Sequence, residues 1–308
     1  DKSLPTVYFG TNGNNTWGKS QSTTVNVTDT GSGVSTRQYQ WTTSATFPTS
    51  GTWTNFTNGE TITRNSGTGN FYLHIKATDV AGNETRVTSN VFRVDNTIPA
   101  LTVTGNPTAW VNSNQTLTVN ASDGNSGVKR IQLPDSTWVN GSTTTYTVSS
   151  NGTYVFTVED NAGNTKTVTV VVTYIDKTLP NGIISINPTS WTNQNVTLTF
   201  NATDKGGSGV KRVRPSGGSW VTGNTTTQTA TSNGTYSFEV EDNAGNTRTV
   251  SFTVSNIDKI HPTVTANPDQ KDWINSGVTV TLAYKDTGGS SLKTKQYAWS
   301  KSETTPST

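Results

Sequence analysis

The sequence contains no cysteine and no methionine, and it carries a formal net charge of only +2 over 308 residues. Without cysteine, disulfides and thiolate chemistry are excluded. So small a net charge gives no electrostatic basis for nucleic-acid binding. No apolar run approaches the roughly 20 residues of a membrane span, and no signal peptide is evident. We therefore predict no nucleic-acid partner and no membrane span in this chain.

Histidine is also scarce, and the two that occur, His74 and His261, belong to different parts of the chain. Neither lies in a recurring Ser/His/Asp arrangement, so a surface or strand-pairing role is the simpler interpretation. The neighbouring acids Glu159 and Asp160 fall in a predicted strand, where adjacent side chains face opposite ways. They are thus unsuited to act as a paired acid and base. We predict that the chain is not an enzyme.

Threonine, serine, asparagine, glycine and valine are abundant instead, and one stretch of them repeats. Residues 151–164 (NGTYVFTVEDNAGN) recur as residues 233–246, with a looser copy at residues 70–83. Alternating apolar positions predict a half-buried strand, and Asp-Asn-Ala-Gly-Asn is typical of a turn. Because residues 165–172 alternate again, the unit is a predicted hairpin, and its recurrence indicates an array.

Four boundaries share the pattern Asp-x-x-x-Pro, and they begin at Asp1, Asp95, Asp176 and Asp258. They predict domains at 1–94, 95–175, 176–257 and 258–308. The last lacks the Tyr-containing strand and the closing hairpin. We expect the chain to be cut from a longer array; the alternative is completion by a strand from another chain.

A tryptophan, an alternating strand and an Asp-led glycine-rich turn follow each boundary. The tryptophans recur at a fixed place, which favours packing in a core or between domains. They are Trp17, Trp110, Trp191 and Trp273, and the predicted strands include residues 25–27, 117–119, 196–198 and 278–280.

Repeats of eighty-odd residues suit about seven short strands, the size of an immunoglobulin-like sandwich. Tyr154 and Phe156, like Tyr236 and Phe238, have the spacing of a tyrosine corner, whereas the first repeat has Leu73 at the tyrosine position. Together with the boundary and turn motifs, this resembles the bacterial Ig-like repeats of large secreted and cell-surface proteins. The resemblance implies an all-β fold of tandem immunoglobulin-like β-sandwich domains in an extended rod, located on the bacterial cell surface or secreted.

Such repeats serve adhesins, S-layer proteins, fibres and spacers, so fold analogy alone does not select a function. Our first hypothesis is a non-catalytic structural protein, a stalk, fibre or surface-layer component that contacts neighbouring copies or repeats. The alternative is an adhesive or carbohydrate-binding module of a secreted enzyme or adhesin. Trp53 and Trp41 are the least constrained aromatic candidates for binding a glycan or cell-surface ligand.

The recurring acids are candidate metal ligands. In an Ig-like sandwich the domain entrance, the second-to-third strand turn and the final hairpin turn lie at one end, so the acids of all three should meet. Calcium, which binds six to eight oxygens, suits such a set. The alternative is that each acid accepts hydrogen bonds within its own turn. The candidates are Asp1, Asp29, Asp79, Asp95, Asp123, Asp160, Asn164, Asp176, Asp204, Asp242 and Asn246.

Overall fold

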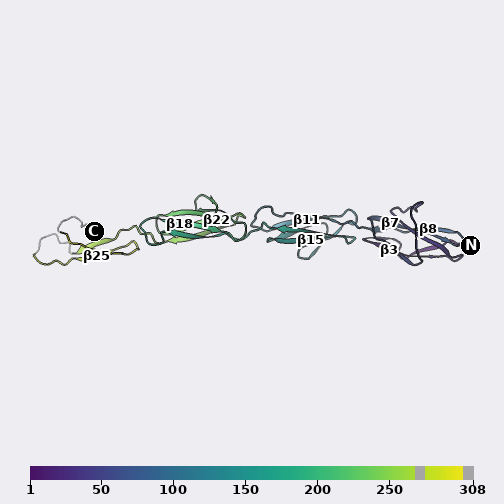
Figure 1. Ribbon diagram of the computed structural model, residues 1–308, viewed down its shortest axis with the longest axis horizontal. Helices are drawn as coiled ribbons and strands as arrows, with labels where there is room; N and C mark the ends of the chain where they lie inside the picture. The colour runs from purple at the N-terminus through teal and green to yellow at the C-terminus, as the bar shows by residue number, and fades with distance from the viewer. Residues whose placement is uncertain (268–274, 301–308) are drawn as a thin grey trace. The chain divides into compact units, whose positions relative to one another are not determined.

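The computed structural model describes residues 1–267 and 275–300, which form strands, turns and loops (Figure 1). No helix occurs within these ranges, and hence none that could cross a membrane. The β-branched and turn-forming composition therefore yields an all-β chain, as the sequence predicts.

The first repeat contains nine strands. They are β1 (Thr6–Phe9), β2 (Asn14–Gly18), β3 (Gln21–Thr28), β4 (Val34–Thr42), β5 (Thr54–Asn55), β6 (Glu60–Arg64), β7 (Gly69–Asp79), β8 (Glu84–Thr88) and β9 (Phe92–Val94). One sheet has the order β1-β3-β6, and the second has the order β2-β9-β7-β4-β5, with β8 also paired to β7. The β2–β9 pair is parallel.

The second and third repeats have seven strands each and the same topology. The second comprises β10 (Ala100–Thr104), β11 (Gln115–Ser122), β12 (Val128–Gln132), β13 (Trp138–Asn140), β14 (Thr143–Val148), β15 (Gly152–Asp160) and β16 (Thr165–Val172). The third comprises β17 (Asn181–Asn187), β18 (Val196–Thr203), β19 (Val210–Pro215), β20 (Val221–Thr222), β21 (Thr225–Ala230), β22 (Gly234–Asp242) and β23 (Thr247–Val254). The sheet orders are β10-β11-β14 and β13-β12-β15-β16, then β17-β18-β21 and β20-β19-β22-β23.

The described part of the fourth repeat contains one hairpin, β24 (Thr263–Asn267) with β25 (Thr281–Lys285). The strand predicted at residues 278–280 begins instead at Thr281. Thr281 pairs with Asn267 of β24. Trp273 lies outside the described residues.

The predicted closing hairpins are confirmed as the pairs β15–β16 and β22–β23, and residues 165–172 form β16 with the bounds that the alternation gives. Each contributes a fully buried phenylalanine, Phe156 or Phe238, to the core. In the third repeat the ring of Phe238 stacks on that of Phe200, with 5.2 Å between centroids. Burying a side chain of this size contributes about 1.5–3 kcal/mol.

The tyrosine corner is present in the second and third repeats. The hydroxyl of Tyr154 donates to the carbonyl of Ser150 over 2.8 Å, and that of Tyr236 donates to the carbonyl of Ser232 over 2.9 Å. In the first repeat, Leu73 is fully buried at the equivalent position. The departure visible in the sequence therefore replaces a hydrogen bond with an apolar core contact.

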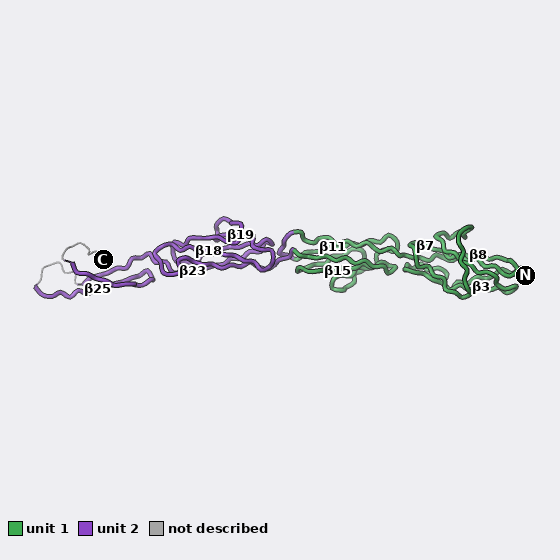
Figure 2. The backbone as a smooth tube through the Cα atoms, in the orientation of Figure 1, with its two compact units in different colours: residues 1–108, 114–173 green, residues 109–113, 174–308 purple. Residues whose placement is uncertain are grey.

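The chain divides into two compact units that are coarser than the repeats (Figure 2). Residues 1–108 and 114–173 form the first, and residues 109–113 and 174–308 form the second. The first unit thus contains two sandwiches. The second contains a sandwich and the β24–β25 hairpin.

Candidate functional site

Each boundary aspartate connects two turns through its carboxylate. One oxygen accepts the backbone N–H two residues further on, and the other accepts the N–H of a serine in the glycine-rich turn. In the second repeat, Asp95 accepts from Thr97 over 2.9 Å and from Ser126 over 3.0 Å. The serine donors of the other repeats are Ser32 to Asp1, Ser208 to Asp176 and Ser290 to Asp258. The same contact therefore recurs at all four boundaries.

Three of these four aspartates are buried although they carry charge, whereas Asp1 is exposed. Asp95 is fully buried, and Asp176 and Asp258 are at most 8% exposed. Burial raises the pKa of Asp95, but the hydrogen bonds from Ser126 and Thr97 outweigh it and hold that pKa below its ordinary value. Burial likewise raises the pKa of Asp176, and the hydrogen bonds from Ser208 and Thr178 lower it by more, so that this pKa is also below its ordinary value.

The main chain of each internal boundary is bonded as well. The N–H groups of Asp95, Asp176 and Asp258 donate to the carbonyls of Gly18, Val111 and Thr192, the residues that directly follow the recurring tryptophans. The residue after the recurring tryptophan is thus hydrogen-bonded to the aspartate of the next boundary.

The closing turn of the second repeat is stabilised by the pair Asp160 and Asn164. The carboxylate of Asp160 accepts both the backbone N–H and the side-chain amide of Asn164, each over 2.7 Å. The same amide donates to the carbonyl of Asp95 over 2.9 Å. Asp79 with Asn83 and Asp242 with Asn246 repeat this arrangement.

A third carboxylate completes each group. Within each group, one carboxylate oxygen from each of three aspartates lies within 4.8 Å of the other two. The groups are Asp1, Asp29 and Asp79; Asp95, Asp123 and Asp160; and Asp176, Asp204 and Asp242. The structure therefore brings together the acids that the sequence predicted to meet. Because most of their oxygens accept turn N–H groups, the alternative role as turn residues is also present in the geometry.

The first two groups retain one oxygen that fits a cation. Oδ1 of Asp29 and Oδ2 of Asp123 are buried and accept no hydrogen bond. The other oxygen of Asp123 accepts the N–H of Gly127 over 2.7 Å, so the turn holds the unpartnered oxygen in place. An all-oxygen donor set of this kind suits calcium, which the side chains named here would hold. Calcium binding stays a prediction.

Three of the four turns have a glycine where the turn passes the boundary carboxylate. A methyl group at Gly31, Gly206 or Gly288 would overlap the carboxylate of Asp1, Asp176 or Asp258. In the second repeat the corresponding position is Asn125, whose N–H donates to Asp123, so that turn accommodates a side chain there. The sequence analysis did not identify the hydrogen bond from the turn serine to the boundary aspartate. The recurrence of Gly and Ser in these turns was the signal in the sequence that could have indicated it.

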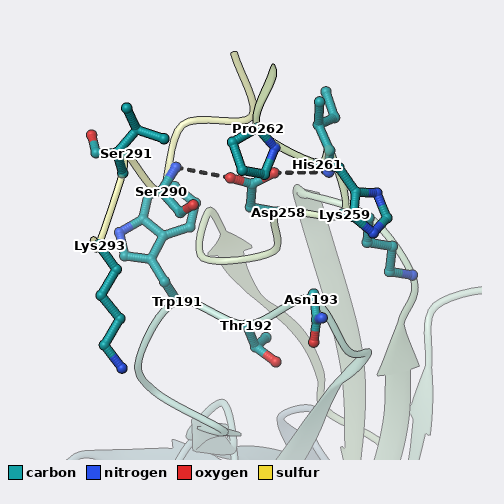
Figure 3. A pocket seen from close by; sticks show the side chains of 12 residues that line it. Trp191, Thr192, Asn193, Asp258, Lys259, His261, Pro262, Ser290, Ser291 and Lys293 are labelled. Atoms are coloured by element: carbon teal, nitrogen blue, oxygen red, sulfur yellow. Dashed lines mark hydrogen bonds between the residues drawn. The ribbon is translucent and has the colours of Figure 1, made fainter. Parts of the chain in front are cut away.

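An open cleft of about 720 Å³ lies beside Asp258 (Figure 3). Trp191, which is 49% exposed, and His261 line it, and the bonds from Ser290 and Ile260 to Asp258 cross it. The Trp191 ring also approaches Gly289, where a Cβ would lie 3.2 Å from it. The tryptophan therefore packs on the turn of the following repeat.

The candidates Trp53 and Trp41 occupy different environments. Trp53 stacks on Phe47 with 5.4 Å between ring centroids, and the ammonium group of Lys76 lies 4.8 Å from its ring. Trp41 packs edge-on against Phe92 and borders the core of the first repeat. These contacts occupy part of both rings; their ligand-binding role stays a prediction.

The loop after β4 encloses His74. This side chain is fully buried, its ring meets Phe47 edge-on, and Nδ1 lies 2.8 Å from the hydroxyl of Thr88. Nε2 lies 3.1 Å from the carbonyl of Ser44, which can only accept. The Thr42 hydroxyl, which also contacts Nε2, donates to that same carbonyl, so Nε2 carries the proton. Burial lowers the pKa of His74, although its bond to Ser44 raises it.

The Lys-Arg pairs of the second and third repeats bind glutamates. A β-bulge between Val128 and Arg130 lets the consecutive Lys129 and Arg130 both reach Glu159, over 2.8 and 2.6 Å. Lys211 and Arg212 bind Glu241 in the same way. The bond from Lys129, followed by that from Arg130, holds the pKa of Glu159 below its usual value against the effect of burial. The sequence indicated the pairs but not the glutamates as their partners.

The bacterial Ig-like domain family matches residues 14–96. The first repeat is therefore a bacterial Ig-like domain. The later repeats lie outside the matched residues, and they carry the same boundary and turn motifs as the matched repeat. No curated protein matches the chain.

Several solved structures are similar to parts of the chain. A 1.5-MDa bacterial ice-binding adhesin, described for its host cell surface retention, is 16% identical with a TM-score of 0.34, covering 83% of this chain and 99% of that one. The fibronectin(III)-like modules of Clostridium thermocellum CbhA are 15% identical with a TM-score of 0.29, covering 56% and 95%. Bacteroides ovatus SGBP-B in complex with a mixed-linkage heptasaccharide is 16% identical with a TM-score of 0.21, covering 85% and 71%. TM-scores this low support no statement about ligand or activity.

Substituting Gly206 by alanine is expected to destabilise the third repeat by about 1–3 kcal/mol, since the added methyl group displaces the Asp176 carboxylate. Calorimetric melting of the whole chain measures this. Gly124→Ala is the control, since it adds the same methyl group to the glycine-rich turn of the second repeat at a place with open space. Equal melting of the two variants would show that the contact does not constrain the turn.

Calcium is expected to raise the melting temperature, and a chelator to lower it, because three carboxylates held close together repel. Asp123→Asn tests this sharply. Its retained carbonyl oxygen can still accept from Gly127, while an amide replaces the unpartnered oxygen. The variant should lose at least part of the calcium response, and a wild type indifferent to calcium leaves these acids as turn residues.

Acidification below about pH 6.5 is expected to destabilise the first repeat. Because folding lowers the pKa of His74, the unfolded chain binds a proton at this residue at a higher pH than the folded chain does. The free energy of unfolding therefore decreases as the pH is lowered through this range. The melting temperature should be lower at pH 5.5 than at pH 7.5, two values about one unit on either side of the ordinary pKa of histidine. His74→Gln should reduce this difference in melting temperature. An unchanged drop in the variant would exclude His74 as its source.

Proposed function

We propose that the chain is a non-catalytic structural segment of an extracellular bacterial protein, a stalk, fibre or surface-layer component. The observation that carries this is the burial and bonding of the boundary residues themselves. Asp95, Asp176 and Asp258 each bond to a turn of their own repeat and to the residue after the preceding tryptophan. A boundary held in this way is a poor hinge, whereas a glycine- or serine-rich linker would be flexible.

The titratable groups support a role without catalysis. His74 is enclosed and bonded to Thr42, Thr88 and Ser44, and Glu159 is engaged by two cations. Asp160, its neighbour, is engaged by Asn164 in the turn. These groups are occupied in maintaining the fold, and the bacterial Ig-like family supports an extracellular or surface location.

Extension of the array follows from this proposal. We expect successive repeats to continue end to end with limited bending and to contact neighbouring repeats or copies. An adhesive or glycan-binding module is the second candidate. The observation that favours it is an exposed tryptophan in the second repeat, Trp138, which is 37% exposed.

Small-angle scattering of the whole chain is expected to show an elongated particle. A variant with about six Gly-Ser residues inserted after Asn96 interrupts the boundary and is the matched comparison. It should give a broader distribution of distances, because the bonds of Asp95 no longer fix the two adjoining repeats. A compact particle for the wild type, or identical flexibility in both proteins, would contradict the proposal.

A further inference from the structure

The outer face of the four-stranded sheet carries a tryptophan in both the second and the third repeat. In the second repeat Trp138 of β13 lies directly opposite Gln132 of β12. The guanidinium of Arg130 lies 4.1 Å from the centre of the Trp138 ring, and Glu159 holds it there. One cation therefore covers part of the indole.

The third repeat covers its tryptophan more completely. The guanidinium groups of Arg212 and Arg214 lie 4.5 and 4.4 Å from the centre of the Trp220 ring. Glu239, opposite Arg214 on β22, binds Arg214 over 2.6 Å. Both rings are partly exposed: Trp138 is 37% exposed, and Trp220 is half-buried.

Two substitutions between the repeats account for this difference. Gln132 stands where the third repeat has Arg214, and Thr157, opposite Gln132 on β15, stands where it has Glu239. The second repeat thus lacks the ion pair that covers the ring in the third. The two repeats share the bulge and the Lys-Arg-Glu group, but the turns before the tryptophans differ, and Trp138 lies in β13 whereas Trp220 precedes β20.

Apart from Arg130, which lies over one part of the indole, the groups that replace the ion pair of the third repeat are uncharged. The Gln132 amide both donates and accepts, and the hydroxyl of Thr157 lies 3.0 Å from that of Thr167 on β16. Lys129 and Arg130 are both engaged by Glu159. An aromatic surface next to a few neutral donors and acceptors fits a sugar ring, which has an apolar C–H face and a rim of hydroxyls. A polyanion would instead need cations without carboxylate partners.

We propose that Trp138, Gln132 and Thr157 form a subsite that stacks one pyranose ring of a neutral glycan, and that Arg214 and Glu239 close the equivalent face of the third repeat. This subsite does not depend on the structural role proposed above. A stalk with or without it has the same repeats and boundaries. It differs from the candidates Trp53 and Trp41 in having an internal, closed counterpart.

Reciprocal exchange of the two residue pairs tests the subsite. Gln132→Arg with Thr157→Glu gives the second repeat the covering ion pair. Arg214→Gln with Glu239→Thr removes that ion pair from the third. The probes are hexasaccharides of glucose, xylose and mannose, titrated to about 10 mM because a single subsite binds weakly. The readout is the indole N–H resonance of each tryptophan in the whole chain, assigned with Trp138→Phe and Trp220→Phe.

At least one hexasaccharide is expected to shift the Trp138 resonance saturably in the wild type, with the Trp220 resonance unmoved. Closing the second repeat should weaken that binding at least tenfold, and opening the third should make the Trp220 resonance respond. Thermal melting of each exchange variant confirms that it folds. No saccharide response at Trp138, or an equal response after closure, overturns the proposal. A Trp138 shift that depends on protein concentration alone also overturns it, because a second copy then occupies the face.

Discussion

The boundary carboxylate, which is buried in all repeats but the first, is the contact on which the end of each repeat depends. A charge removed from water is stable only when donors replace its hydration, and Asp95 receives them from Thr97 and Ser126. Hydrogen bonds to a charged group contribute about 1.5–3 kcal/mol each. The carboxylate therefore fixes the start of the domain against its glycine-rich turn. The main-chain N–H of the same residue bonds to Gly18.

Close approach of further acids follows from this arrangement. The closing turn must lie beside the boundary, since Asn164 donates to the Asp95 carbonyl, and this brings Asp160 near. Asp123 arrives with the turn that supplies Ser126. Turn N–H groups offset much of the resulting repulsion, and a cation would offset more. One geometry thus provides both the turn structure and an oxygen set suited to calcium.

The repeats share this end and differ on the faces of their sheets. The longer first repeat uses its extra loop to cover His74 with Phe47 and Trp53. The second and third repeats use a bulge that directs a Lys-Arg pair toward one glutamate. The bulge adjoins the boundary group, since Val128 pairs with Asp160, and it nevertheless directs the Lys-Arg pair onto the face of the sheet.

Periodicity and turn chemistry were enough to determine the all-β class and the closing hairpins. These features are local: alternation at Tyr154, Phe156 and Val158 specifies a strand whatever packs on it. The meeting of the three acids was also predictable, through the resemblance to Ig-like sandwiches. The tertiary structure alone decided that Ser126 is the donor to Asp95 and that Glu159 binds both Lys129 and Arg130. Those contacts join residues about 30 positions apart, and the strand register that places them depends on the packing of the whole domain.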